Sequence, residues 1–195
     1  MISIRPAQED DLPEIHAIYN HYVLNTVLTF LRHGPPLSYT AEKFHDLKSR
    51  NLPFLVAVEE EESISQSNDT MKRGKVCGFA SASPFRGYML SYAPTVELTL
   101  FLLPTHKSRG IGGKLLESLT IALRETAHVS CEFAGDAEYE AHSESGGVRV
   151  RNLLAVMAVD VDGRDEGEWL RSWYVGKGFE EVGRMKKVGF KMGRW

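Results

Sequence analysis

The chain contains little cysteine, no excess of basic residues and no long apolar run. Its 195 residues include two cysteines, Cys77 and Cys131, which are too few for a disulfide scaffold, so we expect both to be reduced. The formal net charge of -3 argues against a general nucleic-acid binder, which usually carries a basic excess. No apolar stretch approaches the roughly 20 residues that span a bilayer.

The sequence also lacks a targeting segment and a metal-binding pattern. The first residues, MISIRPAQEDD, are acidic and contain no apolar signal-peptide core. The seven histidines are scattered without the spacing of a metal site. A minor alternative is a metal at the carboxylate cluster of Asp160, Asp162 and Asp165. We therefore expect one cytoplasmic domain, residues 1–195, with no metal, no membrane and no nucleic-acid partner.

The spacing of apolar residues changes several times between helical and strand-like periods, which indicates a mixed α/β fold. It predicts strands at 2–5, 54–58, 76–83, 96–103, 153–159 and 179–185, with a further start at 188–192. Helices are predicted at 11–23, 40–50, 166–177 and from the glycine turn to about residue 126. Two polar segments, 60–75 and 128–151, are expected to be inserted loops.

The stretch PTHKSRGIGGKLLESL, residues 104–119, places three glycines between a strand-like run and an amphipathic helix. The first turn of a helix has unpaired N–H groups and a partial positive charge, and both favour a phosphate. Lys107, Arg109 and Lys114 add positive charge. The spacing fits neither the P-loop nor the dinucleotide fingerprint. The turn predicts a phosphate site of another kind, with a plain strand-to-helix turn as the alternative.

The order of strand, KSRGIG (107–112) and amphipathic helix resembles the acetyl-CoA site of the GNAT N-acetyltransferases. Lys107 stands where that family has Gln or Arg, and WYVGKGF (173–179) resembles its aromatic-Tyr-x-x-x-Gly-Phe stretch. Further blocks are similar to the phosphinothricin acetyltransferase branch: IRPAQEDDLPEIHAIYNHYVLNTVLTF, SASPFRGYMLSY, VELTLFLLP and GFEEVGRMKKVGFKMGRW. With the glycine turn, these blocks cover somewhat over half of the chain.

The resemblance implies a single GNAT-type domain with a mixed, largely antiparallel sheet and helices on both faces. Acetyl-CoA would split the sheet between the fourth and fifth strands. Its pyrophosphate would meet the backbone N–H groups of residues 108–113, and its pantetheine arm would pair with the backbone of Leu100–Leu102. The implied cofactor contacts are Leu100, Phe101, Leu102, Lys107, Ser108, Arg109, Gly110, Ile111, Gly112 and Gly113.

Acetylation of an amine requires a neutral nitrogen. Removing the proton from a primary amine with a pKa near 10 costs roughly 4 kcal/mol at pH 7. Glu97 lies in VELTLFLL among apolar neighbours, where burial of a carboxylate is unfavourable and therefore suggests a function. It also matches the glutamate of the resembled branch. We expect Glu97 to accept the proton, directly or through a water. The alternative is a glutamate on an edge strand that faces water.

The remaining site residues follow from the resemblance. Tyr174 stands where GNAT enzymes often carry a tyrosine that protonates the CoA thiolate, although the phosphinothricin branch commonly has histidine. Its alternative role is that of a core aromatic. Within PFRGY, Arg86 would bind a substrate carboxylate, and the pocket would be walled by Phe30, Phe85 and Tyr88. A solvated loop arginine is the alternative for Arg86.

Two departures from the family keep other functions open. Gly167 stands near an expected CoA-binding asparagine, and the family continues past GRW with one more strand, which is missing after Trp195. The favoured function is acetylation of a small amino-acid-like amine by a homodimer, with phosphinothricin, methionine sulfoximine or methionine sulfone implied as substrates. The alternatives are a protein or peptide acetyltransferase, whose acidic insert recruits basic substrates, and an acyl-CoA-binding module without turnover.

Overall fold

The computed structural model describes residues 1–60, 74–87, 89–131, 140–141 and 147–195. A five-stranded sheet in the order β1-β2-β3-β4-β9 forms its centre. The first four strands are antiparallel, and β9 joins β4 in parallel. The strands are β1 (Ile2–Pro6), β2 (Phe54–Glu59), β3 (Lys75–Pro84), β4 (Thr95–Leu102) and β9 (Asn152–Leu154).

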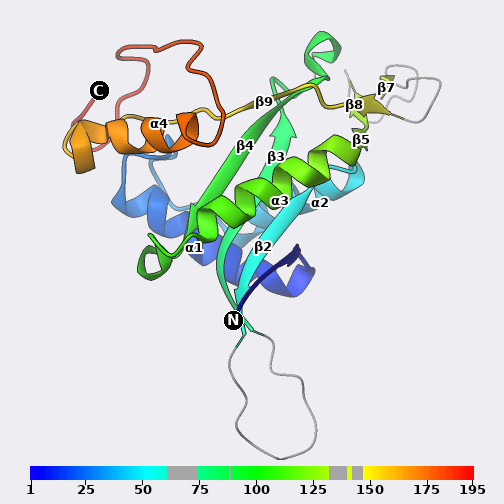
Figure 1. The fold of residues 1–195 in the computed structure, drawn as a ribbon, viewed down its shortest axis with the longest axis horizontal. Helices are drawn as coiled ribbons and strands as arrows, with labels where there is room; N and C mark the ends of the chain where they lie inside the picture. Colours follow the sequence, from blue (N-terminus) through cyan, green and yellow to red (C-terminus); the bar gives the residue numbers. More distant parts are fainter. Residues whose placement is uncertain (61–73, 88, 132–139, 142–146) are drawn as a thin grey trace, which may run out of the picture.

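Helices cover both faces of this sheet (Figure 1). Helix α3 (Ile111–Glu125) crosses in front of the strands, whereas α1 (Leu12–Asn25) and α2 (Leu37–Ser49) lie behind them. Helix α4 (Glu168–Val175) lies beside the end of β4. Short 3-10 turns complete the fold: η1 (Glu9–Asp11), η2 (Leu90–Tyr92), η3 (Pro104–His106) and η5 (Arg164–Gly167).

The core lies between the sheet and the helices. Strand β2 is buried along Phe54–Val58 because helices cover both of its faces. On the α1 and α2 face, the rings of Phe54, Phe79 and Phe101 follow one another with centroids 5.8 and 5.9 Å apart. Phe101 also contacts Tyr22 of α1, with the ring centroids 4.7 Å apart. This row of rings fixes the helices against the middle of the sheet.

Strands β1 to β4 and all four helices confirm the predicted elements to within a few residues at their ends. Two predictions near the C-terminus are wrong. The strand predicted at 153–159 is only Asn152–Leu154, because β4 and β9 part after Glu97. The strand predicted at 179–185 does not form, and the start predicted at 188–192 is reduced to one isolated bridge between Lys191 and Arg194.

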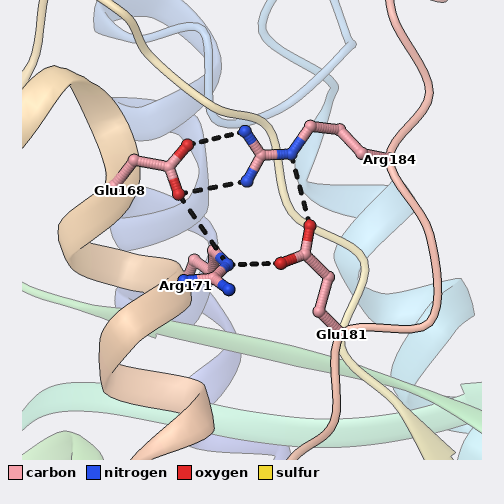
Figure 2. A network of polar contacts seen from close by, with 4 residues as sticks. All are labelled: Glu168, Arg171, Glu181 and Arg184. Atoms are coloured by element: carbon pink, nitrogen blue, oxygen red, sulfur yellow. Dashed lines mark hydrogen bonds and ion pairs between the residues drawn. The ribbon is translucent and has the colours of Figure 1, made fainter.

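Side chains rather than strand pairing hold residues 179–195. Glu168 and Arg171 of α4 form a network with Glu181 and Arg184 (Figure 2). Two hydrogen bonds of 2.7 and 3.1 Å join Arg184 to Glu168, and Arg171 donates to Glu181. The hydrogen bond from Arg184 lowers the pKa of Glu168, and the one from Arg171 lowers the pKa of Glu181. The network therefore ties the segment to α4.

The second predicted insert is more ordered at its base than expected. There β5 (Ala127–His128) pairs with β8 (Val148–Arg149), and β6 (Ser130–Cys131) pairs with β7 (Glu140–Ala141). The two ends of the segment predicted as an inserted loop, 128–151, therefore pair with each other through these short strands. The rest of it, 132–139 and 142–146, and residues 61–73 of the first insert lie outside the described residues.

Candidate active site

The sheet opens between β4 and β9. The two strands pair over three positions only, and the last pair is Glu97 with Leu154. Strand β4 continues to Leu102, so its edge beyond Glu97 has no neighbouring strand in the described structure. At about 3.3 Å per residue, this open edge runs about 17 Å from Glu97 to Leu102. The predicted split of the sheet between its fourth and fifth strands is present.

The hydrogen bonds to β3 show which backbone groups face the opening. The carbonyl of Thr95 accepts from the N–H of Phe85 at 3.1 Å, and the N–H of Leu103 donates to the carbonyl of Cys77 at 2.8 Å. Because backbone direction alternates along a strand, odd-numbered residues of β4 face β3. The backbone groups of Leu100 and Leu102 therefore point into the opening. One of them, the Leu102 carbonyl, already accepts a hydrogen bond of 2.7 Å from the hydroxyl of Tyr22.

The glycine turn lies at the far end of this edge. Gly110 precedes α3 in the left-handed conformation with φ of 77°, and Ser108 has φ of 60°. No side chain caps the first turn of α3 in the described structure. The N–H groups at the start of the helix are therefore available to an anion.

Two of the three cations of the turn, Arg109 and Lys107, already contact protein groups, whereas Lys114 is exposed. Glu59 at the end of β2 pairs with Arg109 at 3.2 Å and with Nε2 of His106 at 2.9 Å. The hydrogen bond with His106 is the main cause that lowers the pKa of Glu59. Lys107 lies over the ring of Tyr22, with Nζ 5.1 Å from the ring centroid. The turn therefore offers a phosphate its backbone N–H groups and the exposed Lys114.

Sequence reasoning missed Lys177, which lies close to the turn. A Cβ atom placed on Gly113 would lie 3.2 Å from the Nζ of Lys177. The signal was present in the motif VGKGF, in which Lys177 received no role. Its neighbour on the same segment, Trp173, lies 3.7 Å from a Cβ placed on Gly112. The start of α3 and the end of α4 therefore face each other at the open edge of β4.

These groups fit acetyl-CoA on two independent features. A Cβ on Gly112 would contact Leu102 at 3.6 Å and Leu100 at 3.8 Å, so glycine keeps the space between the turn and the open edge free. The open edge offers backbone donors and acceptors to an amide-containing arm, and the start of α3 offers N–H groups to a pyrophosphate.

Glu97 lies at the apex of the opening. It is opposite Ser83 of β3 and Leu154 of β9, so no charged residue flanks it on either strand. Its side chain points to the α1 and α2 face, the same face as Phe101. In the part of the chain that the structure describes, its carboxylate has no hydrogen bond or ion pair, and Lys43 of α2 is its charged neighbour. Lys43 carried no signal in the sequence.

Tyr174 packs between two aromatic rings. Its ring centroid lies 4.9 Å from that of Trp173 and 5.3 Å from that of Phe179. Burial raises the pKa of Tyr174 to about 12, so its hydroxyl is protonated at neutral pH. This environment agrees with a proton donor and equally with a core aromatic.

Among the described residues, the contacts join only two of the predicted substrate residues, Arg86 and Phe85. Arg86 is exposed on the loop between β3 and β4, with its guanidinium 5.9 Å from the ring centroid of Phe85. Phe30 is 57 % exposed and lies against Gly189 of the C-terminal segment. The described contacts do not join these two groups. Tyr88 lies outside the described residues.

The carboxylate cluster has a protein partner. Arg194 pairs with Asp160 at 2.7 Å and with Asp162 at 2.8 Å, and Asp165 pairs with Arg164. Among the described residues, no three His, Cys, Asp or Glu side chains gather as metal ligands do. The helices described here include none with the length and apolar character needed to cross a bilayer.

Known proteins resemble this chain over its length. The acetyltransferase (GNAT) family matches residues 15–134. Phosphinothricin N-acetyltransferase of Streptomyces coelicolor is 27% identical over 100% of this chain and 91% of its own. L-methionine sulfoximine/L-methionine sulfone acetyltransferase of Pseudomonas aeruginosa is 28% identical, over 99% of this chain and 88% of its own. The phosphinothricin acetyltransferase of Sinorhizobium meliloti, solved with acetyl-CoA, superimposes with a TM-score of 0.73 at 27% identity, covering 100% and 83% of the two chains.

Proposed function

The chain belongs to the acetyltransferase (GNAT) family and transfers acetyl from acetyl-CoA to an amine, and we propose that its acceptor is the amino group of a small amino acid. Phosphinothricin, methionine sulfoximine and methionine sulfone are the substrates we propose to test first, because relatives of 27 and 28% identity are named for them. The observation that carries the proposal is the opening of the sheet at Glu97, with the glycine turn at its other end.

Each end of the opening has a role in this proposal. The N–H groups at the start of α3 bind the pyrophosphate of acetyl-CoA, and Leu100 pairs with its amide-containing arm. Bound acetyl-CoA supplies an activated acetyl group. Glu97 accepts the proton of the incoming ammonium at the apex, where its carboxylate has no competing partner among the described residues. Tyr174, protonated at neutral pH, donates a proton to the departing thiolate.

An assay of thiol release over a panel of amines tests the function. The panel contains the free amino acids, phosphinothricin, methionine sulfoximine, methionine sulfone and lysine-bearing peptides. We expect turnover of one or more small amino acids and none of the peptides. Turnover of peptides alone would indicate a protein acetyltransferase. Calorimetric binding of acetyl-CoA without thiol release over any amine would indicate a binding module.

The role of Glu97 is tested by Glu97→Gln, which keeps the shape of the side chain and removes the base. We expect kcat to fall at least about 100-fold, since general acid–base catalysis contributes about 10²–10⁴-fold. The affinity for acetyl-CoA should not change, because Glu97 lies at the opposite end of the opening from the glycine turn. A variant with the wild-type rate would show that Glu97 is not the base.

We also propose a single-domain protomer that assembles as a homodimer, by analogy with the resembled branch. Light scattering over a range of concentrations tests the oligomeric state. A mass of one chain of 21.9 kDa at all concentrations would contradict the dimer.

A further inference from the structure

A polar group lies on the α1 and α2 face of the sheet, one step along that face from Glu97. Lys43 of α2 donates a hydrogen bond of 3.4 Å from Nζ to Oγ1 of Thr99. Thr99 and Glu97 share this face because alternate residues of a strand point to the same side. Lys43 is near enough for the Glu97 carboxylate to raise the pKa of the lysine, although burial lowers that pKa more strongly.

The ammonium of Lys43 has too few partners for its environment. It can donate three hydrogen bonds, yet within the described structure it makes only the long one to Thr99 and has no carboxylate at ion-pair distance. A charged group held partly out of water is unfavourable unless it is paired. An anion bound here would therefore satisfy the lysine.

The space beside Lys43 has the size of one oxygen. A crevice of about 20 Å³ lies between α1, α2 and the sheet, and its lining includes Lys43 and Thr99. That volume holds about one water molecule. Ser81 is the cross-strand partner of Thr99 on the same face, and its buried Oγ has no hydrogen-bond partner among the described residues. The ammonium of Lys43 and the hydroxyl of Thr99 thus line a space for a single oxygen, and the unpartnered hydroxyl of Ser81 belongs to the neighbouring strand.

We propose that Lys43, together with Thr99, binds the carboxylate on the carbon that carries the reacting amine, so that the enzyme selects α-amino acids over amines without a carboxylate. The inference rests on the proposed function, in which Glu97 receives that amine. Both groups of an α-amino acid are attached to one carbon. A substrate held by its amine at Glu97 therefore presents its carboxylate to a cation on the same face of the sheet, where one carboxylate oxygen fits the crevice.

This assignment replaces the one expected from the sequence. Arg86 was expected to bind the carboxylate, but its side chain is exposed and lies over the ring of Phe85. Lys43 is partly buried beside the apex of the opening. A charge–carboxylate contact is stronger where water is excluded, so Lys43 is better placed to discriminate than Arg86.

The test compares a substrate with its decarboxylated counterpart. The pair is the best amino acid of the panel and the amine that lacks its carboxylate, for example methionine sulfone and 3-(methylsulfonyl)propan-1-amine. Lys43→Met should raise the KM of the amino acid at least tenfold and change kcat/KM of the amine less than twofold. Lys48→Met, on the exposed side of the same helix, is the control and should change neither.

Each contrary result has a distinct meaning. Equal losses with both substrates in Lys43→Met overturn this inference and leave the proposed function intact. The inference is also overturned, and the proposed function left intact, if Arg86→Met loses the discrimination between the amino acid and the amine while Lys43→Met keeps it. A wild-type protein that acetylates no amine overturns the proposed function, and this inference with it.

Two further variants test the inference if Lys43→Met does not fold. Lys43→Arg keeps the charge and should retain most of the discrimination between the two substrates. Thr99→Val keeps the shape of the strand residue and removes the hydroxyl next to the crevice. It should raise the KM of the amino acid about threefold without affecting the amine. If Lys43→Met does not fold, equal effects of Thr99→Val on both substrates overturn the inference.

Discussion

The hydroxyl of Tyr22 donates a hydrogen bond of 2.7 Å to the carbonyl of Leu102, 80 residues away in the chain. This bond fixes α1 to the open edge of β4. It also fills one of the acceptors that the pantetheine arm was expected to use. Lys107 lies over the same ring, so Tyr22 connects the first helix, the edge of the sheet and the glycine turn.

Tyr22→Phe should lower the free energy of unfolding by about 1–2 kcal/mol, because the Leu102 carbonyl loses its buried partner while the ring packing on Phe101 remains. Denaturant unfolding measures the change. Tyr92→Phe removes the hydroxyl of an exposed tyrosine and is the control, with an expected change below about 0.5 kcal/mol. Equal stability of the two variants would mean that the bond does not contribute.

Glu59→Gln should change how stability depends on pH. His106 and Arg109 lower the pKa of Glu59 in the folded protein below its ordinary value of 4.5. The unfolded chain therefore binds the proton more readily than the folded protein does. The stabilisation by the Glu59 carboxylate is complete above about pH 4.5, and it is lost as the pH falls through the pKa of Glu59 in the folded protein.

Denaturation midpoints between about pH 3 and pH 7 check this prediction. The denaturation midpoint of the wild type should be higher than that of Glu59→Gln at neutral pH. The two midpoints should become equal in acid. Glu60→Gln, an exposed neighbour, should follow the wild type over the whole range. A constant difference between wild type and Glu59→Gln at all pH values would exclude the carboxylate as its source.

Elements that bury their own apolar face could be predicted from the sequence. The period of Leu115, Leu116 and Leu119 predicts α3, and these residues are buried. The length of β9 could not be predicted, because it depends on how far β4 stays beside it. Residues 179–185 alternate enough to suggest a strand, yet no partner strand is available in the described structure. The network of Arg171 and Arg184 holds them instead.

The candidate site also contains residues that the sequence predicts and contacts that it does not predict. The glycine turn and Glu97 are local signals, one in a motif and the other in an apolar run. The contacts that set their surroundings join distant residues: Arg109 with Glu59 at a separation of 50 positions, and Lys43 with Thr99 at 56. No local pattern encodes such contacts, so Lys43 and Glu59 received no binding role from the sequence.

The glycine turn should bind acetyl-CoA mainly through its backbone. Gly112→Val fills the space between the turn, Leu100 and Leu102, and should raise the KM for acetyl-CoA about tenfold or more. Lys114→Met removes an exposed charge and should change it less than about threefold. Steady-state kinetics at saturating amine measure both. A larger effect of Lys114→Met would mean that the turn acts as a charge patch.

Lys191 anchors the C-terminal segment to the end of α1. Its Nζ donates to the carbonyls of Val23 at 2.7 Å and Thr29 at 2.9 Å, and its side chain is almost fully buried. Lys191→Met should cost about 2 kcal/mol at neutral pH, because both carbonyls lose a charged donor. Lys186→Met, on an exposed part of the same segment, is the control and should be neutral.

Burial lowers the pKa of Lys191 below its ordinary value of 10.5, so the unfolded chain holds the proton to higher pH than the folded one. The free energy of unfolding then rises with pH between the pKa of Lys191 in the folded protein and about 10.5. Over this range the folded protein loses the proton and no longer buries a charge. The difference in unfolding free energy between wild type and Lys191→Met should widen over that range. A difference in unfolding free energy that stays constant or becomes smaller as the pH rises would show that Lys191 is not buried as a cation. The segment would then be anchored by other contacts.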